Sequence, residues 1–368
     1  MEILIPILTF MLGYFAEKVL DKMSTFFADR LRFARNRKRK DASKKRRAIN
    51  AIFTEDIYPC ISSDNIWVKD AGKRLFLSFP TALVSQLHDV EGAFATEDAS
   101  FCDFKLPGRS LEDICNAIEI ARNEIALKFI NREDGLYFNG DKLGVVFLDS
   151  KSRSADTKET PQLLVEFFRT DYFTHRTIER AVELLGLPCD AIDTQSLNTD
   201  LQWIRTSFGI SIIVVLKSSN QIILTHRSKN ASFSEGKRWI YVSATEALSQ
   251  VDIDEYESTP DLALCVKRGI KEELGISKDM YRDNGLKFYD CFFETQFFQD
   301  GIVASVELSE NVKPEDILSL RAKDKRLEIQ DIFFIDNTKS AIKKFILENQ
   351  DEMRSQTIFA LESYIASL

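Results

Sequence analysis

The sequence predicts an α+β protein built from three consecutive parts. A chain of 368 residues is longer than the roughly 100–200 residues of a single domain, so more than one domain is expected. Hydrophobic residues make up 44% and charged residues 29% of the chain, which is typical of a folded protein and excludes a mainly disordered one. Strand-like and helix-like segments alternate after an apolar N-terminal helix. We therefore expect a membrane-type helix with a basic collar in 1–48, an α/β middle region in 49–204 and a further domain in 205–368.

The net charge of −8 is distributed unevenly along the chain. Residues 1–50 hold 13 Lys/Arg against 5 Asp/Glu, a net charge of +8, whereas the remaining residues hold 36 against 52, a net charge of −16. Because attraction to phosphate is mostly electrostatic, such an acidic body binds nucleic acid poorly. Duplex nucleic acid is therefore not an expected partner. Any polyanion has to contact the N-terminal segment or a local basic pocket.

The N-terminal segment has the composition of a short membrane helix. Residues 3–16 carry no charge and correspond to about 21 Å of helix, and extension to Leu20 gives about 27 Å, against about 30 Å of hydrocarbon. Residues 30–47 then contain 11 Lys/Arg. This order satisfies the positive-inside rule. We therefore expect one anchor in the inner (cytoplasmic) membrane, contact with its anionic lipids, and the body of the protein in the cytoplasm.

Other interpretations of the N-terminal segment stay open. A soluble helix could pack its apolar face on the body or on another subunit, and the basic run could be a tail for nucleic acid. Whether a membrane helix spans the bilayer or lies in its plane is also open. A signal peptide is disfavoured because its positive charge would precede the apolar stretch. Pro6 and Gly13, in a span slightly too short for the bilayer, favour packing against copies of itself, so a homo-oligomer is expected.

The middle region contains recognisable helix and strand patterns. A helix is predicted over residues 111–130 by one apolar stripe, formed by Ile114, Ile118, Ala121, Ile125 and Phe129. The dipeptide Asn139–Gly140 predicts a hairpin between two short strands in 136–149. A further strand is expected over 163–168 and a helix over 177–187.

A polar run joins that strand to that helix. Asp171, Tyr172, His175 and Arg176 have two interpretations. They form either a polar recognition corner or, as is more common, a helix cap beside aromatic side chains that fill the core. The contribution of residues 49–204 to function stays open.

The segment after residue 205 carries the candidate chemistry. Two strands are expected over 209–228 with a turn at 218–220, and Trp239 begins another strand. A helix follows, with Thr259 as its N-cap, Pro260 in its first turn and Gly275 at its end. The helix has an apolar face, formed by Leu262, Val266, Ile270 and Leu274. Its polar side is expected to present three charged residues together, namely Arg268, Glu272 and Glu273.

This helix resembles the signature of the Nudix superfamily. Residues 268–276 read Arg-Gly-Ile-Lys-Glu-Glu-Leu-Gly-Ile, against Arg-Glu-aliphatic-x-Glu-Glu-x-Gly-aliphatic in that family. The two preceding strands and Trp239 stand where that fold would place them, so the resemblance covers about 205–350. It implies an α/β/α sandwich with a mixed sheet. It also implies hydrolysis of nucleoside diphosphate derivatives, assisted by Mg²⁺ held on carboxylates.

The resemblance implies roles for individual residues. Glu272 and Glu273 would be catalytic and would bind the metal, with Glu328 as a further metal ligand and Asp324 as its nearest competitor. Three residues would contact the ligand: Arg227, Trp239 and Arg268. Arg268 would also orient Glu272. The alternative is an ordinary salt-bridged helix surface.

The signature is degenerate at two points. Gly269 stands where the family usually has a metal-binding glutamate, and the upstream Gly-x5-Glu falls on Asp254 and Pro260. Glu246, after Trp239, is a candidate replacement. Because a ligand is missing from the usual position, the sequence leaves open whether the domain is a pyrophosphohydrolase.

Three functions follow from these patterns. A membrane helix before a degenerate nucleotide domain is similar to effectors of bacterial anti-phage signalling systems that use cyclic oligonucleotides. The first expectation is thus a membrane-anchored sensor or effector that recognises a nucleotide or cyclic oligonucleotide. The second is a membrane-associated, Mg²⁺-dependent hydrolase of nucleoside diphosphate derivatives. The third is a scaffold in which the same domain only makes protein contacts.

Overall fold

The computed structural model describes residues 49–51, 65–88, 90–99, 104–133, 136, 138–151, 162–187, 192–228, 238–254, 258–322 and 328–368. The chain divides into two units, Met1–Arg47 and Ala48–Leu368, and all described residues belong to the second. The expectations for the membrane helix, its collar and Asp324 therefore lie outside the described residues. Among the residues that are described, no helix combines the length and the apolar character needed to cross a bilayer.

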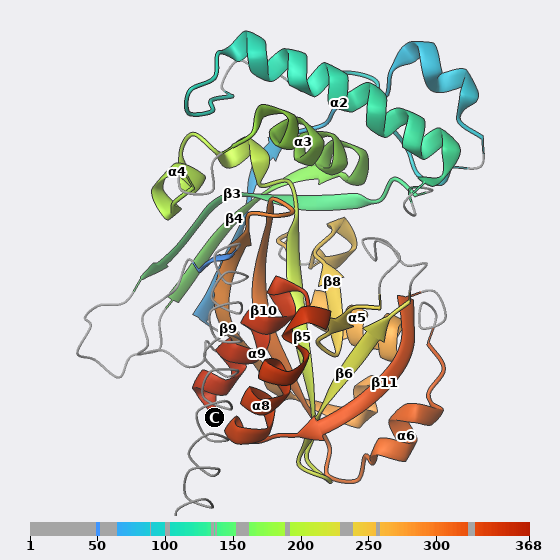
Figure 1. Cartoon of the computed structure of the whole chain (residues 1–368), viewed down its shortest axis with the longest axis vertical. Helices are drawn as coiled ribbons and strands as arrows, with labels where there is room; N and C mark the ends of the chain where they lie inside the picture. Colours follow the sequence, from blue (N-terminus) through green and yellow to red (C-terminus); the bar gives the residue numbers. More distant parts are fainter. Residues whose placement is uncertain are drawn as a thin grey trace, which may run out of the picture. The chain divides into compact units, whose positions relative to one another are not determined.

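A large mixed sheet forms the centre of the second unit (Figure 1). Its main path runs β1 (Ile49–Ala51), β9 (Tyr281–Glu294), β10 (Gln299–Leu308), β5 (Phe208–Leu216), β6 (Gln221–Arg227) and β11 (Ile329–Asp336). Two short strands extend it, β7 (Ile240–Tyr241) on β6 and β8 (Ala244–Ala247) on β5. Strands β5 and β10 are parallel, and the other described pairs of this sheet are antiparallel. The structure is mixed α/β with mixed sheets, which is consistent with the predicted α+β class.

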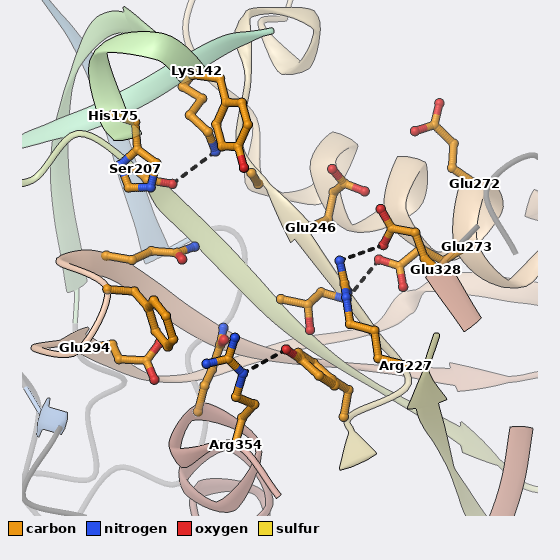
Figure 2. A pocket seen from close by; sticks show the side chains of 17 residues that line it. Lys142, His175, Ser207, Arg227, Glu246, Glu272, Glu273, Glu294, Glu328 and Arg354 are labelled. Carbon is orange, nitrogen blue, oxygen red and sulfur yellow. Dashed lines mark hydrogen bonds and ion pairs between the residues drawn. The ribbon is translucent and has the colours of Figure 1, made fainter. Parts of the chain in front are cut away.

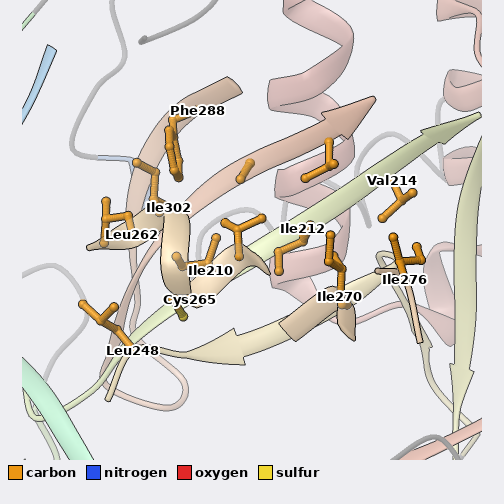
Figure 3. Packing of buried hydrophobic residues seen from close by; sticks show 14 of the residues in the cluster. Ile210, Ile212, Val214, Leu248, Leu262, Cys265, Ile270, Ile276, Phe288 and Ile302 are labelled. Atoms are coloured by element: carbon orange, nitrogen blue, oxygen red, sulfur yellow. The ribbon is translucent and has the colours of Figure 1, made fainter. Parts of the chain in front are cut away.

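Helices cover both faces of this sheet, and β5 is buried at every position. Ile210, Ile212 and Val214 point into a core shared with α5 (Leu262–Leu274), as Figure 3 shows. Ile213 and Val215 point the other way, into a core shared with α8 (Lys339–Asn349) and α9 (Ser355–Ser367). The period of two along a strand thus produces three layers, helix, sheet and helix. The helix α6 (Pro314–Ser319) precedes β11.

Helix α5 confirms most of its sequence prediction and corrects its start. The four apolar positions predicted to face the core are all buried, and Gly275 ends the helix at a φ of 79°. The N-cap, however, is Asp261 and not Thr259: its carboxylate accepts the amide of Ala263 at 2.6 Å and that of Leu264 at 3.3 Å. Pro260 lies before the helix and not in it, and it forms an isolated antiparallel β-bridge with Ile253.

A second, three-stranded sheet belongs to the middle region. It has the order β2 (Ile66–Arg74), β4 (Gln162–Asp171) and β3 (Asp141–Lys151), with β2 and β4 parallel. It is accompanied by α2 (Leu111–Asn131), α3 (Tyr172–Leu185) and α4 (Thr194–Asn198). Short 3-10 turns complete the described elements: η2 (Thr81–Gln86), η5 (Gln202–Ile204), η6 (Gln250–Asp252), η7 (Lys278–Met280) and η8 (Gln350–Glu352). The predicted apolar stripe of α2 is buried at all five positions, which confirms that helix.

The two sheets share one core. Val145 of β3, Val165 and Phe167 of β4 belong to the same buried cluster as Ile210 and Ile212 of β5. The expected boundary between 204 and 205 therefore lies inside a continuous apolar cluster of the second unit. This arrangement allows residues of the middle region to line a cavity together with residues of the large sheet.

The hairpin predicted at Asn139–Gly140 is wrong. The amide nitrogen of Asn139 donates to the carbonyl of Ala93 at 2.7 Å and to Asp171 at 3.1 Å, and its amide oxygen accepts from the backbone N–H of Phe173 at 2.8 Å. This side chain therefore links β4 and α3 internally. One long strand, β3, follows it where two short strands were predicted.

Helix α3 begins at Tyr172, five residues before its predicted start. Asp171 caps it by accepting the amide of Thr174 at 2.8 Å, and Phe173 is fully buried. The helix-cap interpretation of the polar run is thus confirmed for these residues. Two other members of the run, Tyr172 and His175, face a cavity.

Glu179 in α3 predicts a pH dependence of stability. Burial outweighs the attraction of Arg176, whose Nη1 lies 2.7 Å from Glu179 Oε2, and raises the pKa of Glu179 to about 7. A raised carboxyl pKa stabilises the fold fully below the unfolded value of 4.5, and this contribution is lost as the pH rises through 7. In urea unfolding, we expect Glu179→Gln to match the wild type near pH 4.5 and to exceed its free energy of unfolding by about 3 kcal/mol at pH 8. A difference that stays constant between these pH values contradicts the prediction. The exposed Glu348→Gln serves as the control.

A fully buried ion pair joins the two sheets. Arg205 follows η5 and donates from Nη2 to Asp300 Oδ1 at 2.6 Å and from Nε to Oδ2 at 2.9 Å, with both side chains 0% exposed. The backbone carbonyl of Arg205 accepts the amide of Val145 in β3 at 2.8 Å, while Asp300 belongs to β10. The pair therefore fixes the distance between the middle region and the large sheet.

Candidate functional site

A cavity of about 290 Å³ lies where the two sheets meet (Figure 2). The large sheet and α5 supply one wall, and β3, α3 and α9 supply others. Four glutamates gather on one side, Glu246, Glu272, Glu273 and Glu328, which we call the acidic end. Lys142, His175 and Arg354 lie away from them, and we call this the mixed end. It includes Tyr172, whose ring centre lies 5.4 Å from Lys142 Nζ.

The acidic end contains all three predicted metal-binding residues. Glu272 and Glu273 lie in the last turn of α5, and Glu328 immediately precedes β11. Glu273 is 5% exposed, and its Oε1 accepts the backbone amide of Thr245 at 3.0 Å. The short strand β8 adds Glu246 to the same wall. The sequence therefore anticipated this grouping, while the catalytic and metal-binding roles stay predictions.

Arg227, at the end of β6, lies among these carboxylates. Its Nη2 is 3.0 Å from Glu328 Oε2, and its guanidinium lies 5.1 Å from the centre of the Tyr241 ring. The side chain is 14% exposed and lines the cavity. Its Nε is buried without a hydrogen-bond partner among the described residues. A guanidinium held in this way can donate to a phosphate oxygen.

The other two residues predicted to contact ligand lie elsewhere. Trp239 is not part of the described cavity lining, and its ring lies 5.7 Å from the guanidinium carbon of Arg354. Arg268 also lies outside the lining. It supports the lining instead, because Nε and Nη2 donate to Asp252 at 2.8 and 2.7 Å and Nη1 donates to Glu246 at 2.8 Å. Its distance to Glu272 is 3.5 Å, so Arg268 holds Glu246 more closely than the predicted Glu272.

Gly269 explains how Glu246 reaches the acidic end. A Cβ at position 269 would lie 2.8 Å from Cβ and 3.2 Å from Cγ of Glu246. Such an approach to Cβ is shorter than ordinary contacts, so β8 can pack this closely only on a glycine. The glycine in the signature and the position of Glu246 are thus linked. Helix α5 lacks a carboxylate at position 269, and the adjacent strand β8 supplies one through Glu246.

Gly269→Ala is expected to cost about 1–2 kcal/mol of the free energy of unfolding. Overpacking against Glu246 costs about 1–3 kcal/mol, and alanine returns up to about 1 kcal/mol through its higher helix propensity. In the background of Glu246→Gly the contact is absent, so the same change should be neutral or stabilising. A double-mutant cycle by urea unfolding measures this. Equal costs in both backgrounds would show that Glu246 is not the obstacle.

The acidic end carries more negative charge than its arginines balance. Burial, together with Glu328 and Glu272, outweighs Arg268 and raises the pKa of Glu246 to about 7. Burial, followed by repulsion from Glu328, raises the pKa of Glu273 well above its ordinary value against the attraction of Arg227. A bound cation would relieve this repulsion. These residue types suit Mg²⁺, a hard cation that prefers oxygen ligands.

The side chains as they stand do not form a complete metal cage. Among the described residues, no group of three or more His, Cys, Asp or Glu side chains is close enough to hold one ion. Magnesium, however, commonly binds one or two carboxylates and completes its shell with water and substrate phosphates. The acidic end therefore fits a cation that arrives with a phosphate ligand better than one that is permanently bound.

The mixed end shows what the middle region contributes. Lys142 comes from β3 and His175 from α3, and burial together with Lys142 and Arg176 keeps the pKa of His175 well below its usual value. His175 Nδ1 is 2.9 Å from Thr206 Oγ1, so its neutral ring is held in place. The polar run at 170–176 was the sequence signal for His175. Lys142 had no comparable signal.

Across the cavity, α9 and the turn after β9 complete the mixed end. Arg354 donates from Nε to Tyr241 Oη at 3.0 Å, and its guanidinium carbon lies 4.2 Å from the centre of the Phe297 ring. Glu294 accepts a short hydrogen bond from Ser355, and burial raises its pKa while Arg354 opposes this shift. Arg354 and Glu294 could not be assigned to the site from the sequence, because neither residue belongs to a recognisable motif.

No protein-family model matches the chain, and no curated protein matches it. We therefore infer what the cavity can bind from its geometry and charge.

Proposed function

We propose that this protein is a membrane-anchored, Nudix-like protein that recognises a nucleoside diphosphate derivative together with Mg²⁺. One observation carries the proposal: four glutamates and Arg227 line the same wall of one cavity. Carboxylates are suitable ligands for Mg²⁺, and a guanidinium is suitable for a phosphate oxygen. The cation would offset negative charge on both the glutamates and the diphosphate, and the guanidinium of Arg227 would bind the diphosphate as well.

The fold supports the Nudix-like part of the proposal. Helix α5 packs on one face of a mixed sheet and ends at a left-handed glycine, Gly275, two residues after Glu273. Its Arg268 holds a neighbouring carboxylate by a charge-assisted hydrogen bond. The replacement of the missing helix carboxylate by Glu246 keeps the acidic character of the wall.

The size of the cavity limits the ligand. Its volume of about 290 Å³ lies near the lower end of the roughly 300–1,000 Å³ found for small-molecule sites. One nucleotide fits such a space. A cyclic oligonucleotide would place one of its nucleotides in the cavity and the others outside it.

The proposed biological role is that of a sensor and effector in bacterial anti-phage defence. It depends on the sequence of residues 1–48, whose apolar helix and basic collar favour attachment to inner-membrane lipids and self-association. A nucleotide can switch such a protein only if it binds more tightly to the active or assembled state.

Hydrolysis by Nudix-type chemistry is the second candidate. Its specific support is Glu246, because a carboxyl with a pKa of about 7 can accept a proton from an attacking water near neutral pH. This function predicts Mg²⁺-dependent release of a nucleoside monophosphate. The sensor predicts binding with little turnover.

Calorimetry on the full-length chain in detergent tests the recognition step. Nucleoside mono-, di- and triphosphates and cyclic oligonucleotides are titrated with and without Mg²⁺, and the product of each mixture is assayed for hydrolysis. We expect saturable binding of a diphosphate derivative that requires Mg²⁺. Absence of binding across the panel would overturn both candidate functions.

Vesicle leakage tests the effector step. The full-length protein in vesicles that contain anionic lipid should release a trapped dye when nucleotide is added. Deletion of residues 1–30 should abolish this release and leave nucleotide binding unchanged. Ligand-triggered release that survives the deletion would contradict the proposed role of the N-terminal segment.

A further inference from the structure

Lys142 differs from three arginines of the described region that are paired with carboxylates. Arg205 is paired with Asp300, Arg227 with Glu328 and Arg268 with Asp252 and Glu246. Lys142 Nζ instead donates to the neutral Ser207 Oγ at 3.2 Å and lies 5.4 Å from the centre of the Tyr172 ring. Within the part of the chain that the structure describes, it forms no ion pair. A buried ammonium without a carboxylate leaves much of its charge uncompensated.

Lys142 is also fixed in position. Its backbone lies in β3 opposite Thr170 of β4, so the strand pair holds the base of the side chain. Figure 2 shows its ammonium turned towards Ser207 at the wall of the cavity, next to His175. Of the three N–H donors of an ammonium, one is used by Ser207. The remaining donors are available to a group inside the cavity.

Apart from Lys142, the side chains of the mixed end are either neutral or paired with an opposite charge. Glu294 and Arg354 attract one another, and His175 is held neutral by its burial. Gln356 is neutral and donates to Ser211 Oγ at 2.9 Å. The mixed end therefore presents the positive charge of Lys142, whereas the acidic end presents four carboxyl groups.

The two ends are close enough for one ligand. Glu246 attracts Lys142 across the cavity and opposes the effect of burial, which lowers the pKa of Lys142 to about 8. Lys142 and Glu246 both line this one cavity, whose volume is about 290 Å³. A ligand whose diphosphate lies at the acidic end would thus extend to Lys142.

We propose that Lys142 binds a second anionic group of the same ligand, so that the ligand class is a nucleoside diphosphate that carries a further phosphate. This inference rests on the proposed function. The middle region would then select the ligand. Lys142 of β3 would bind the additional phosphate, whereas a neutral substituent would leave the ammonium of Lys142 without an anionic partner. Discrimination of this kind is strong when a buried polar group would otherwise remain without a partner.

The test compares ADP and GDP with derivatives that carry one more phosphate on the 2′, 3′ or 5′ side. Binding to the full-length protein is measured by calorimetry with Mg²⁺. At least one derivative should bind the wild type about 10-fold or more tightly than its parent diphosphate. Lys142→Met should remove this gain and leave affinity for the parent within about threefold. Lys142→Arg should retain most of the gain, and Lys344→Met, at an exposed site, should change nothing.

The outcomes separate this inference from the proposed function. If no nucleotide binds the wild type, the proposed function fails. If the parent diphosphates bind but no derivative binds more tightly, or if the gain persists in Lys142→Met, only the role of Lys142 is overturned. Thermal unfolding of Lys142→Met shows whether the variant is folded. If it is not, Lys142→Gln, which retains hydrogen-bond donors without charge, must lose the gain for the inference to stand.

Discussion

Replacement of Glu273 by glutamine is expected to weaken Mg²⁺-dependent nucleotide binding by about 100-fold. Glu273 is the most deeply buried carboxylate of the acidic end, and its position is fixed by the amide of Thr245. Glutamine keeps the shape and the acceptor oxygen but removes the negative charge that a cation needs. Changes around metal sites typically reduce affinity by about 10–100-fold, and loss of a ligand should reach the upper end.

The measurement is calorimetry with a nucleoside diphosphate at several Mg²⁺ concentrations. Glu348→Gln, on the exposed side of α8, is the matched control and should bind like the wild type. The apo fold should tolerate Glu273→Gln, because glutamine resembles the protonated carboxyl that its raised pKa favours. If the protein is a hydrolase, turnover should disappear together with binding. Unchanged dependence on Mg²⁺ would exclude Glu273 as a metal ligand.

Asp300→Asn is expected to cost about 3–5 kcal/mol of the free energy of unfolding. It leaves the guanidinium of Arg205 buried without a compensating charge. Burial raises the pKa of Asp300 against the attraction of Arg205, but the two hydrogen bonds of the pair make the loss of its charge costly. Arg205 retains its bonds to the carbonyl of Leu197 at 3.2 Å and to Asn198 at 2.9 Å. These neutral acceptors do not replace a carboxylate. Urea unfolding of the full chain measures the loss.

The matched control is a pair of the same type at the surface. Arg180 Nε lies 2.7 Å from Glu124 Oε2, with side chains 37% and 43% exposed. Glu124→Gln should cost at most about 1 kcal/mol, because solvent screens an exposed pair. The double change Arg205→Met with Asp300→Leu should recover much of the loss of the single variant. Similar costs for Asp300→Asn and Glu124→Gln would show that burial does not determine the value of these pairs.

Sequence reasoning succeeded where periodicity decides the structure. The apolar positions of α5 and α2 repeat at helical spacing, so their buried faces could be assigned residue by residue. Within the site, Glu272 and Glu273 were found because one helix turn places them together. The start of α5 was placed wrongly because Thr259 and Asp261 are both good caps, and only the three-dimensional path of the loop selects between them.

The rest of the site depends on contacts between distant segments. Asp252 accepts hydrogen bonds from Arg268. Lys142 reaches the cavity from β3, a strand that begins more than sixty residues before β5. No local pattern marks either residue. The turn predicted at Asn139–Gly140 failed for the same reason, because the Asn139 amide bonds to two separate segments, at Ala93 and at the junction of β4 and α3. In the sequence, Gly269 indicated only the loss of a metal-binding glutamate. The proximity of Glu246 explains why a glycine occupies this position.

The short strand β1 has a mechanical consequence. Ile49, two residues after the end of the N-terminal unit, pairs with Glu294 in β9, and Glu294 pairs in turn with Gln299 in β10. Glu294 and Gln299 both line the cavity. A pulling force on the N-terminal segment is therefore borne first by the ladder that forms the cavity wall. A ligand that stiffens this wall would also strengthen the point at which the N-terminal segment continues into the second unit.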